Sequence, residues 1–444
     1  MKITIIGSGY VGTVTGTCLA ELGHQVICAD AKVSHIAGLQ KGEVSFFEEA
    51  LSPMIRGNLE EGRLAFTTDI VSAVKSSAVI FLCIGTPILP TGKPDFSALT
   101  MAVKDIAAGM DGYRLIIEKS TLPIKTGTWL SSLLCEHVTG EVDFDIAAVP
   151  QFLREGHAVQ DFMHPDRIII GADSKKALDT IMEIYQPLNA PILVTDVNSA
   201  ELIKHATNAF LATKISFINS IAQICEKTGA DINAVSRGLG LDHRIDSSYL
   251  NAGIGYGGIF FPKDINSLLN IADEYHINLD LLKQVDHINR YQRISFIEKL
   301  DAALDNHLEG KTIAIWGISY RPKTNDLRDI PSFTIIRGLE NRGANIRVYD
   351  PLSMAKAKEQ LPKLTYCDSA YDAAKGADAI AILTEWDEFA YINFTKLRQE
   401  SDCRLIVDGR NLYSLKRMTN LGYTYVSIGR QTVTPQMQSP ITGL

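Results

Sequence analysis

The stretch KITIIGSGYVG (residues 2–12) decides the fold. Its apolar start predicts a buried strand, and a G-x-G-x-x-G run, Gly7, Gly9 and Gly12, leads from it into a helical pattern. The glycines permit a tight turn, a close approach of a diphosphate to the backbone, and close packing of helix on strand. The unpaired N–H groups at the start of that helix would face the diphosphate. The stretch therefore predicts a dinucleotide-binding unit.

An acidic residue at the end of the second expected strand indicates which dinucleotide binds. Asp30 follows the apolar run 25–29, roughly 20 residues after the glycines. Its carboxylate can accept hydrogen bonds from both hydroxyls of a ribose and disfavours a 2′-phosphate, so the motif favours NAD over NADP. The alternative is a glycine turn of an α/β fold that binds another ligand.

Short apolar runs alternate with helical patterns in both halves of the chain, which is typical of parallel strands covered by helices on both faces. Between the halves, residues 198–229 repeat their apolar positions about every 3.6 residues without proline, which predicts one long helix. The predicted fold class is α/β, with two doubly wound Rossmann-like domains joined by a long central helix. Strands are expected within 2–7, 25–30, 78–85, 114–120, 144–150, 311–318, 345–351, 379–384, 404–410 and 424–429.

Composition excludes several classes of function. The 444 residues are 46% apolar and 21% charged, as in soluble globular proteins. The net charge is −8 and no segment concentrates Lys and Arg, which argues against nucleic-acid and anionic-membrane surfaces. Seven scattered cysteines without a C-x-x-C predict buried thiols in a reducing compartment and no metal site. Because no run of about 18 apolar residues exists, we expect no membrane span and a cytoplasmic location.

Several further segments together resemble the nucleotide-sugar dehydrogenases of the UDP-glucose/GDP-mannose type, most closely the members that oxidise UDP-glucose. The resemblance covers nearly the whole chain and makes UDP-glucose the favoured substrate, although relatives act on UDP-N-acetyl sugars. It rests on IGSGYVG (6–12), GTPILPTGKPD (85–95), EKSTLP (118–123), PQFLREGHAVQDF (150–162), AELIKHATNAFLATKISFIN (200–219), GYGGIFFPKD (255–264), SYRPKTNDLRDIPS (319–332), VYDP (348–351) and DGRN (408–411).

The resemblance implies a domain organisation and a pair of partners. We expect an NAD-binding Rossmann-like domain at 1–197 and a central helical domain with the long helix and the glycine-rich loop at 198–305. A Rossmann-like UDP-binding domain is expected at 306–428 and a mobile tail at 429–444. The expected partners are a UDP-sugar substrate and, because the long helix is suited to an interface, a second copy of the chain in a homodimer.

The family oxidises the C6 alcohol of the sugar to a carboxylate in two NAD-dependent steps. In the first step, a water held by an aspartate and a lysine removes the alcohol proton, and the matching residues here are Asp264 and Lys204. Asn208, one helical turn beyond Lys204, matches a companion asparagine. The lysine ammonium can also stabilise an oxyanion that develops at C6. Without the resemblance, Lys204 would be read as a solvated charge on an amphipathic helix.

The resemblance also implies binding residues. The implied NAD contacts are Gly7, Gly9, Tyr10, Val11, Gly12, Asp30, Thr86, Thr121, Lys263 and Arg328. The implied UDP-sugar contacts are Gln151, Phe152, Leu153, Arg154, Glu155, Lys204, Asn208, Tyr249, Leu250, Asn251, Ala252, Gly253, Gly257, Phe260 and Arg321. Arg321 would lie near the diphosphate, where a fixed positive charge is favourable.

Two short segments depart from the family pattern, one at Val149 and Gln151 and the other at Ile259 and Phe260. The glycine-rich loop of the family contains a cysteine that adds to the aldehyde and forms a thioester, and this chain has Ile259-Phe260 where the family has Ser-Cys. The family also has a glutamate, thought to activate water for thioester hydrolysis, where this chain has Gln151, which accepts no proton near neutral pH. Both second-step groups are therefore missing, while Lys204, Asn208 and Asp264 are present.

These departures predict oxidation that stops at the 6-aldehyde, with Phe260 filling space that would admit water. Four alternatives stay open at this point. A hydrated aldehyde could donate a second hydride without a cysteine and give the full four-electron reaction. The hydride could return to a rearranged sugar, so that net redox is zero. The chain could be a silent nucleotide-sugar-binding protein, or a variant engineered to block turnover.

Overall fold

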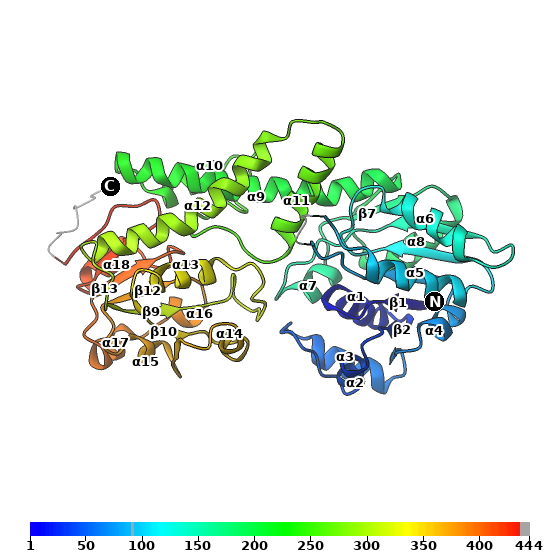
Figure 1. The fold of residues 1–444 in the computed structure, drawn as a ribbon, viewed down its shortest axis with the longest axis horizontal. Coiled ribbons are helices and arrows are strands. Elements are labelled where there is room, and N and C mark those ends of the chain that lie inside the picture. The colour runs from blue at the N-terminus through cyan, green and yellow to red at the C-terminus, as the bar shows by residue number, and fades with distance from the viewer. Residues whose placement is uncertain (90–92, 436–444) are drawn as a thin grey trace. The chain divides into compact units, whose positions relative to one another are not determined.

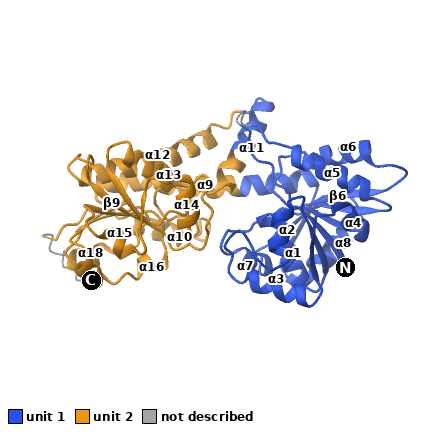
Figure 2. Cartoon of the chain, turned by 60° about the horizontal axis from the view of Figure 1, so that its bottom comes forward, with its two compact units in different colours: residues 1–207, 266–277 blue, residues 208–265, 278–444 orange. Residues whose placement is uncertain are grey.

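The computed structural model describes residues 1–89 and 93–435. Contacts divide the chain into two compact units, shown in separate colours in Figure 2. Unit 1 contains residues 1–207 and 266–277, and unit 2 contains 208–265 and the chain from 278 onward. Two of the three boundaries fall inside helices, α9 (Val197–Thr228) and α11 (Phe260–Glu274), and the third follows α11. The three-domain division expected from the sequence stays a prediction.

Unit 1 is built around an eight-stranded sheet in the order β3-β2-β1-β4-β5-β6-β7-β8, parallel except between β6 and β7. Its first six strands have the order of a dinucleotide-binding doubly wound sheet. The strands are β1 (Lys2–Ile6), β2 (Gln25–Ala29), β3 (Leu64–Thr67), β4 (Val79–Leu82), β5 (Arg114–Glu118), β6 (Phe144–Ala148), β7 (Ile168–Ala172) and β8 (Ile192–Thr195).

Helices cover both faces of this sheet because its strands are apolar on both faces. Ile3 and Ile5 of β1 pack under α1, α3, α7 and α8, whereas Ile6 packs under α4, α5 and α6. Figure 1 shows these helices around the sheet. The helices are α1 (Tyr10–Glu21), α2 (Val33–Leu39), α3 (Leu51–Glu60), α4 (Ile70–Ser76), α5 (Ser97–Gly109), α6 (Thr126–His137), α7 (Ala158–Met163), α8 (Lys175–Tyr185) and the 3₁₀ helix η1 (Gln186–Leu188).

Unit 2 has a second parallel sheet, of six strands in the order β11-β10-β9-β12-β13-β14. Its core also has two faces: Ile313 and Ile315 pack with α12 and α13, and Trp316 packs with α15, α17 and α18. The strands are β9 (Thr312–Trp316), β10 (Asn345–Tyr349), β11 (Thr365–Tyr366), β12 (Ala379–Ile382), β13 (Leu405–Asp408) and β14 (Thr424–Ser427). The helices are α10 (Ile232–Gly240), α12 (Asp280–Ala303), α13 (Pro331–Glu340), α14 (Met354–Gln360), α15 (Ala370–Ala374), α16 (Asp387–Ala390), α17 (Phe394–Glu400) and α18 (Leu415–Asn420).

The predicted fold class is confirmed, and each of the ten expected strands is present. The long helix expected at 198–229 is α9. The sequence reading missed β3, β8 and β11, which lie at the ends of the sheets, and also β7, which lies next to the end strand β8. No helix in the described ranges is both long and apolar enough to cross a bilayer.

Part of the segment expected to be a mobile tail is ordered. Arg430 is buried and donates to the Ser427 and Tyr425 hydroxyls, at 2.9 Å each, and Val433 pairs with Tyr425. Gly429 N–H donates to Glu226 of α9 at 2.7 Å. Unit 2 therefore extends past residue 428, and the rest of the expected tail, 436–444, lies outside the described residues.

Candidate active site

The turn after β1 forms a cradle with a tightly packed floor and an open rim. Gly7 has a φ of +91°, which lets the chain turn from β1 into α1. A Cβ built on Gly12 would lie 1.8 Å from the Gly7 carbonyl oxygen, so only glycine fits there. A Cβ on Gly9 would meet no described atom within 4 Å, which leaves space above the residue that precedes α1. Tyr10 and Val11 follow in the first turn of α1, whose N–H groups face that space.

Asp30 lies where the second strand ends and closes the rim of this cradle. Its carboxylate accepts the N–H groups of Ser8, at 2.8 Å, and Lys32, at 3.0 Å, which fixes its orientation. Thr86 is placed after β4, and its buried hydroxyl has no hydrogen-bond partner among the described residues. A buried hydroxyl without a partner is costly unless a ligand satisfies it. The cradle, the carboxylate and this hydroxyl fit a bound dinucleotide.

Glu48 connects the cradle with the segment predicted to contact the sugar, and the sequence reading missed it. Its carboxylate accepts the Tyr10 hydroxyl at 2.6 Å and the Gly156 N–H at 2.9 Å. Burial raises the pKa of Glu48, and these hydrogen bonds oppose that rise. No motif marks this glutamate, because it lies on the loop before α3 and meets Tyr10 only through the fold.

The segment Gln151 to Glu155 follows β6 in unit 1, and its polar side chains are largely engaged inside the unit. The buried Gln151 accepts the Leu153 N–H at 2.6 Å. Arg154 forms a two-pronged ion pair with Asp161, at 3.0 and 2.6 Å, so its charge is already balanced. Leu153 and Glu155 are buried.

Lys204 of α9 is buried, and its ammonium lies 5.2 Å from the centre of the Phe152 ring. The same ring carries the Arg167 guanidinium at 3.9 Å. Lys204 and Thr121 line one small cavity in unit 1, together with two acids that the sequence reading did not single out, Glu118 and Glu201. Each of the four is at most 6% exposed. The cavity thus combines two predicted site residues with a buried pair of carboxyl groups.

In unit 2, two of the predicted catalytic residues meet directly. The Asn208 amide donates a hydrogen bond to the carboxylate of Asp264, which is fully buried in the first turns of α11. The neighbouring Lys263 is half-buried, and burial lowers the pKa of its ammonium. Phe260 is the first residue of α11 and is half-buried.

The predicted sugar-binding loop of unit 2 is held by polar and aromatic contacts. Gly253 N–H donates to Asn219 of α9 at 2.9 Å, and a Cβ on Gly257 would lie 2.5 Å from Pro331. The Phe261 ring packs edge-on against Tyr256 at 5.5 Å and also meets Tyr249 at 6.2 Å. Of the other loop residues, Leu250 and Ala252 are buried and Asn251 is exposed.

The two predicted arginine contacts of unit 2, Arg321 and Arg328, follow β9 on the segment that leads to α13. Arg328 is paired with Asp326, whose carboxylate accepts its Nε at 2.8 Å, and Arg321 is half-buried. The predicted site residues therefore fall into two groups, one in each unit. The structure brings Thr121 close to Lys204 in unit 1 and Asn208 close to Asp264 in unit 2.

Comparison with known proteins assigns these features to one family. The family model for the UDP-glucose/GDP-mannose dehydrogenase NAD-binding domain matches residues 1–189, the central-domain model matches 198–291, and the UDP-binding-domain model matches 314–415. The chain belongs to the UDP-glucose/GDP-mannose dehydrogenase family. It is therefore an NAD-dependent oxidoreductase that acts on the CH–OH group of a UDP-sugar.

The relatives of this dehydrogenase span its full length. The UDP-glucose 6-dehydrogenase TuaD of Bacillus subtilis is 42% identical over 433 residues, which cover 97% of this chain and 94% of that protein. A UDP-glucose dehydrogenase structure from Pyrobaculum islandicum has a TM-score of 0.90 at 30% identity and covers 97% of this chain and 98% of its own. A UDP-D-ManNAc dehydrogenase structure from Pyrococcus horikoshii has a TM-score of 0.85 at 27% identity, with coverage of 97% and 99%.

The buried carboxyl pair of the dehydrogenase gives a stability prediction. Burial, followed by the charge of Glu201, raises the pKa of Glu118 well above its usual range. Folded Glu118 therefore keeps a proton that the unfolded chain releases above its ordinary pKa, so wild-type stability falls as the pH rises between these two values. Glu118→Gln removes this dependence. The unfolding free energy of the variant, relative to that of the wild type, should increase by up to about 1.4 kcal/mol per pH unit between about pH 5 and 7.

Urea unfolding of both proteins over that pH range measures the gain, with Glu141→Gln at an exposed position as the matched control. The gap between variant and wild type should widen as the pH rises for Glu118→Gln and stay constant for the control. A constant gap for both variants would contradict a protonated Glu118.

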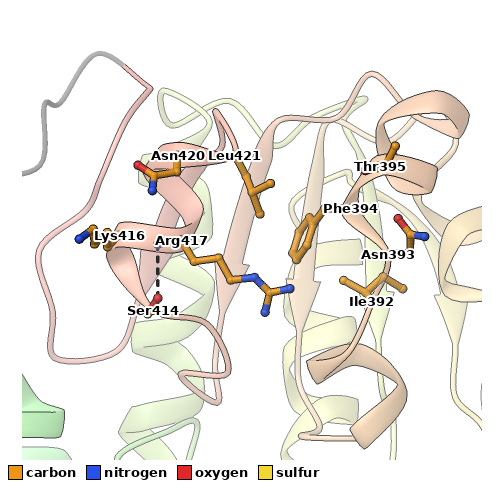
Figure 3. Close-up of a pocket in the computed structure, with 9 residues that line it drawn as sticks. All are labelled: Ile392, Asn393, Phe394, Thr395, Ser414, Lys416, Arg417, Asn420 and Leu421. Atoms are coloured by element: carbon orange, nitrogen blue, oxygen red, sulfur yellow. Dashed lines mark hydrogen bonds between the residues drawn. The ribbon is translucent and has the colours of Figure 1, made fainter.

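The dehydrogenase also has an open hollow on the helical layer of unit 2, away from the predicted site residues. Figure 3 shows the Arg417 guanidinium extending from α18 towards the Phe394 ring, whose centre lies 5.1 Å away. The hollow is lined by Ile392, Asn393, Phe394, Thr395, Ser414, Lys416, Arg417, Asn420 and Leu421. Its arginine packs on aromatic rings of the unit itself, so the contact is a packing contact of α17 with α18.

Proposed function

We propose that this dehydrogenase oxidises the C6 hydroxyl of a UDP-hexose, UDP-glucose first among them, once, and releases the 6-aldehyde. The observation that carries the proposal is the phenylalanine at residue 260, the first residue of α11. A thiolate at a helix N-terminus would be stabilised by the helix dipole and could add to an aldehyde. A phenyl ring forms no such bond, so residue 260 cannot start a thioester route.

Gln151 supports the same limit on the reaction. Its carbonyl oxygen accepts the Leu153 N–H, so the side chain is committed to the backbone of its own loop. An amide does not take up a proton near neutral pH, and the side chain therefore cannot act as the base that activates water. Among the residues that depart from the family pattern, Phe260 and Gln151 both affect the second oxidation, whereas the residues assigned to the first oxidation are present.

The first oxidation needs a proton acceptor and a positive charge at C6. We assign proton removal to a water held by Asp264 and Lys204, with Asn208 fixing the Asp264 carboxylate through the hydrogen bond described above. The Lys204 ammonium stabilises the alkoxide that develops at C6. Bound NAD supplies the acceptor for the hydride. The balanced step turns the alcohol and NAD⁺ into the aldehyde, NADH and a proton.

The binding residues inferred from the resemblance stay proposals of the same kind. In unit 1, the glycine turn and Asp30 would hold the pyrophosphate and a ribose of NAD, and Thr86 and Thr121 would contact the cofactor. In unit 2, the backbone of residues 249–253 and 257 would wrap the nucleotide sugar. Arg321 would lie near its diphosphate. Because Arg154 and Arg328 already have carboxylate partners, a ligand would have to share them.

The test is the NADH formed per UDP-glucose consumed, with hydroxylamine present to trap an aldehyde and mass detection of the product. One NADH and a trapped 6-aldehyde support the proposal. Two NADH and UDP-glucuronate contradict it and require a second step without cysteine. Binding of NAD and UDP-sugars without any NADH also contradicts it, and favours a redox-neutral or silent protein. The same assay with UDP-N-acetyl sugars tests the choice of sugar.

We also propose that the enzyme is a homodimer joined through α9. Phe210, Phe217 and Ile224 are each more than half exposed and recur every seven residues, so they form one apolar stripe on the helix. A second copy of the chain presents the same stripe and can bury it in a two-fold interface. Large apolar stripes on a soluble protein mark such interaction surfaces.

Phe210→Asp combined with Phe217→Asp should convert the dimer to a monomer. Burying a phenylalanine contributes roughly 1.5–3 kcal/mol, so losing two per chain should raise the dissociation constant by roughly a hundredfold or more. Light scattering coupled to size-exclusion chromatography measures the mass over a dilution series. Tyr391→Asp, at an exposed position beyond α16, is the control. An unchanged mass for the double variant would show that α9 is not the interface.

A further inference from the structure

The carboxyl groups of Glu118 and Glu201 lie side by side in unit 1, and nothing in the reaction proposed above uses them. Glu118 ends the central strand β5, and Glu201 lies near the start of α9. A Cβ built on Gly127 would be 3.5 Å from an oxygen of Glu118 and 3.7 Å from an oxygen of Glu201. Both side chains are buried, and two buried carboxyl groups this close cannot both be ionised.

The backbone determines which of the two acids carries the charge. The Glu201 oxygens accept the N–H groups of Lys125, at 2.6 Å, and of Gly127, at 3.0 Å. These groups lie at the N-terminus of the twelve-residue helix α6, where a negative charge is stabilised. Burial, followed by the charge of Glu201, raises the pKa of Glu118, and neither Glu118 oxygen has a hydrogen-bond partner among the described residues. Glu201 is therefore the carboxylate, and Glu118 is the acid that keeps its proton.

The pair shares its cavity with Lys204 and with Thr121. Lys204 follows Glu201 by three residues on α9, so the two side chains lie on the same face of the helix. The cavity offers about 10 Å³ to the centre of a water molecule, which is room for about one water. The shared charge and the lysine thus face one enclosed polar space.

The other ionisable groups around this cavity are basic, opposite in charge to the Glu118–Glu201 pair. Lys119 follows β5, donates to the Tyr185 hydroxyl at 3.1 Å, and has a pKa that burial lowers to about 8. The charge of Lys204 is among the causes that lower this pKa, because the two ammonium groups repel each other. His205 of α9 is bonded to the Leu122 carbonyl at 2.7 Å, and Arg167 stacks on the Phe152 ring. Lys204 is therefore held among basic groups, which an adjacent negative charge would offset.

We propose that Glu118 and Glu201 act as one positioning unit for Lys204: a single negative charge, fixed on Glu201 by the start of α6, keeps the lysine ammonium charged and oriented towards C6. The same carboxylate fixes the loop between β5 and α6 through Lys125 and Gly127, and this loop also carries Thr121. The inference rests on the proposed function, because it assigns these residues a part in the same oxidation.

The test compares Glu118→Gln with the double variant Glu118→Gln/Glu201→Gln. The single change keeps a donor beside a charged Glu201, and the double change removes the charge while keeping the shape. Removing an opposite charge makes an ammonium lose its proton at lower pH. The alkaline limb of kcat/KM should therefore shift to lower pH by about one unit in the double variant, a roughly tenfold loss on that limb. In Glu118→Gln the limb should stay within about 0.3 unit of the wild type.

Alkaline limbs that coincide in the two variants would overturn the proposal, since loss of structure alone lowers the rate without moving the limb. Infrared difference spectra of the wild type against Glu118→Gln supply a second measurement that needs neither substrate nor the double variant. A protonated carboxyl band at neutral pH is expected in the wild type, and its absence would also contradict the proposal that Glu118 and Glu201 share one proton. If the proposed function were wrong instead, the wild type would form no NADH but the infrared band would still appear.

Discussion

Changing Phe260 to cysteine together with Gln151 to glutamate is expected to raise the NADH formed per UDP-glucose from one to two. The cysteine would occupy the first position of α11, where the helix dipole lowers the pKa of a thiol and favours the thiolate. The thiolate adds to the aldehyde, the adduct gives up a hydride, and a thioester results. A glutamate at 151 could keep the bond to the Leu153 N–H with one oxygen and activate water with the other.

The single changes separate the two roles. Phe260→Cys alone should accumulate a covalent thioester, visible as an adduct in the intact mass of the protein, because its hydrolysis lacks a base. Gln151→Glu alone should still stop at one NADH. Ile259→Cys, one residue before the helix, is the matched control and should form no adduct. A double variant that binds NAD normally yet still yields one NADH would show that more than these two residues separates this chain from a four-electron enzyme.

Asp264→Asn should lower kcat by about 10²–10⁴-fold, the range expected when a general base is lost. The amide has nearly the same shape as the carboxylate and can still meet Asn208, so the change removes proton acceptance and leaves the packing of α11 in place. NAD affinity, measured by calorimetry, should stay within about twofold because the cofactor residues are unchanged. This combination of results assigns the effect to chemistry.

Asp273→Asn, at an exposed position of the same helix, is the control and should keep wild-type kcat. Equal activity of Asp264→Asn and wild type would remove Asp264 from the proposed reaction. A parallel fall in kcat and in NAD affinity would instead point to a structural role of the residue.

Features that depend on neighbours in the chain could be predicted from the sequence. The glycine spacing at 7–12 and the acid at 30 gave the cradle after β1, because strand, turn and helix are contiguous there. The long helix was predictable because its apolar positions repeat without interruption. Of the missed edge strands, β11 has only two residues, and β8 has a short apolar run in which Leu193 and Val194 are exposed, so neither shows the long buried apolar run typical of a central strand.

Features that depend on the fold could not be predicted in this way. Glu118 and Glu201 are far apart in the sequence, and only the sheet and α9 bring them to one cavity. The pairing of Arg154 with Asp161 of α7 also depends on the fold, and the substrate contact expected for Arg154 stays a prediction. Sequence patterns indicate which side chains are polar and near a site. They do not indicate which of those side chains form hydrogen bonds or ion pairs within the protein.

In the proposed reaction, Phe260 would also determine whether the oxidation can run backwards. Hydrolysis of a thioester is strongly downhill and makes oxidation to a carboxylate a one-way process. An enzyme that stops at the aldehyde has no such irreversible step. The net direction of its reaction depends on the ratio of NADH to NAD⁺ and on the pH, since each turnover releases one proton. At low pH and high NADH the same residues would return a 6-aldehyde to the alcohol. A single aromatic side chain would thus turn a committed biosynthetic step into a reversible exchange.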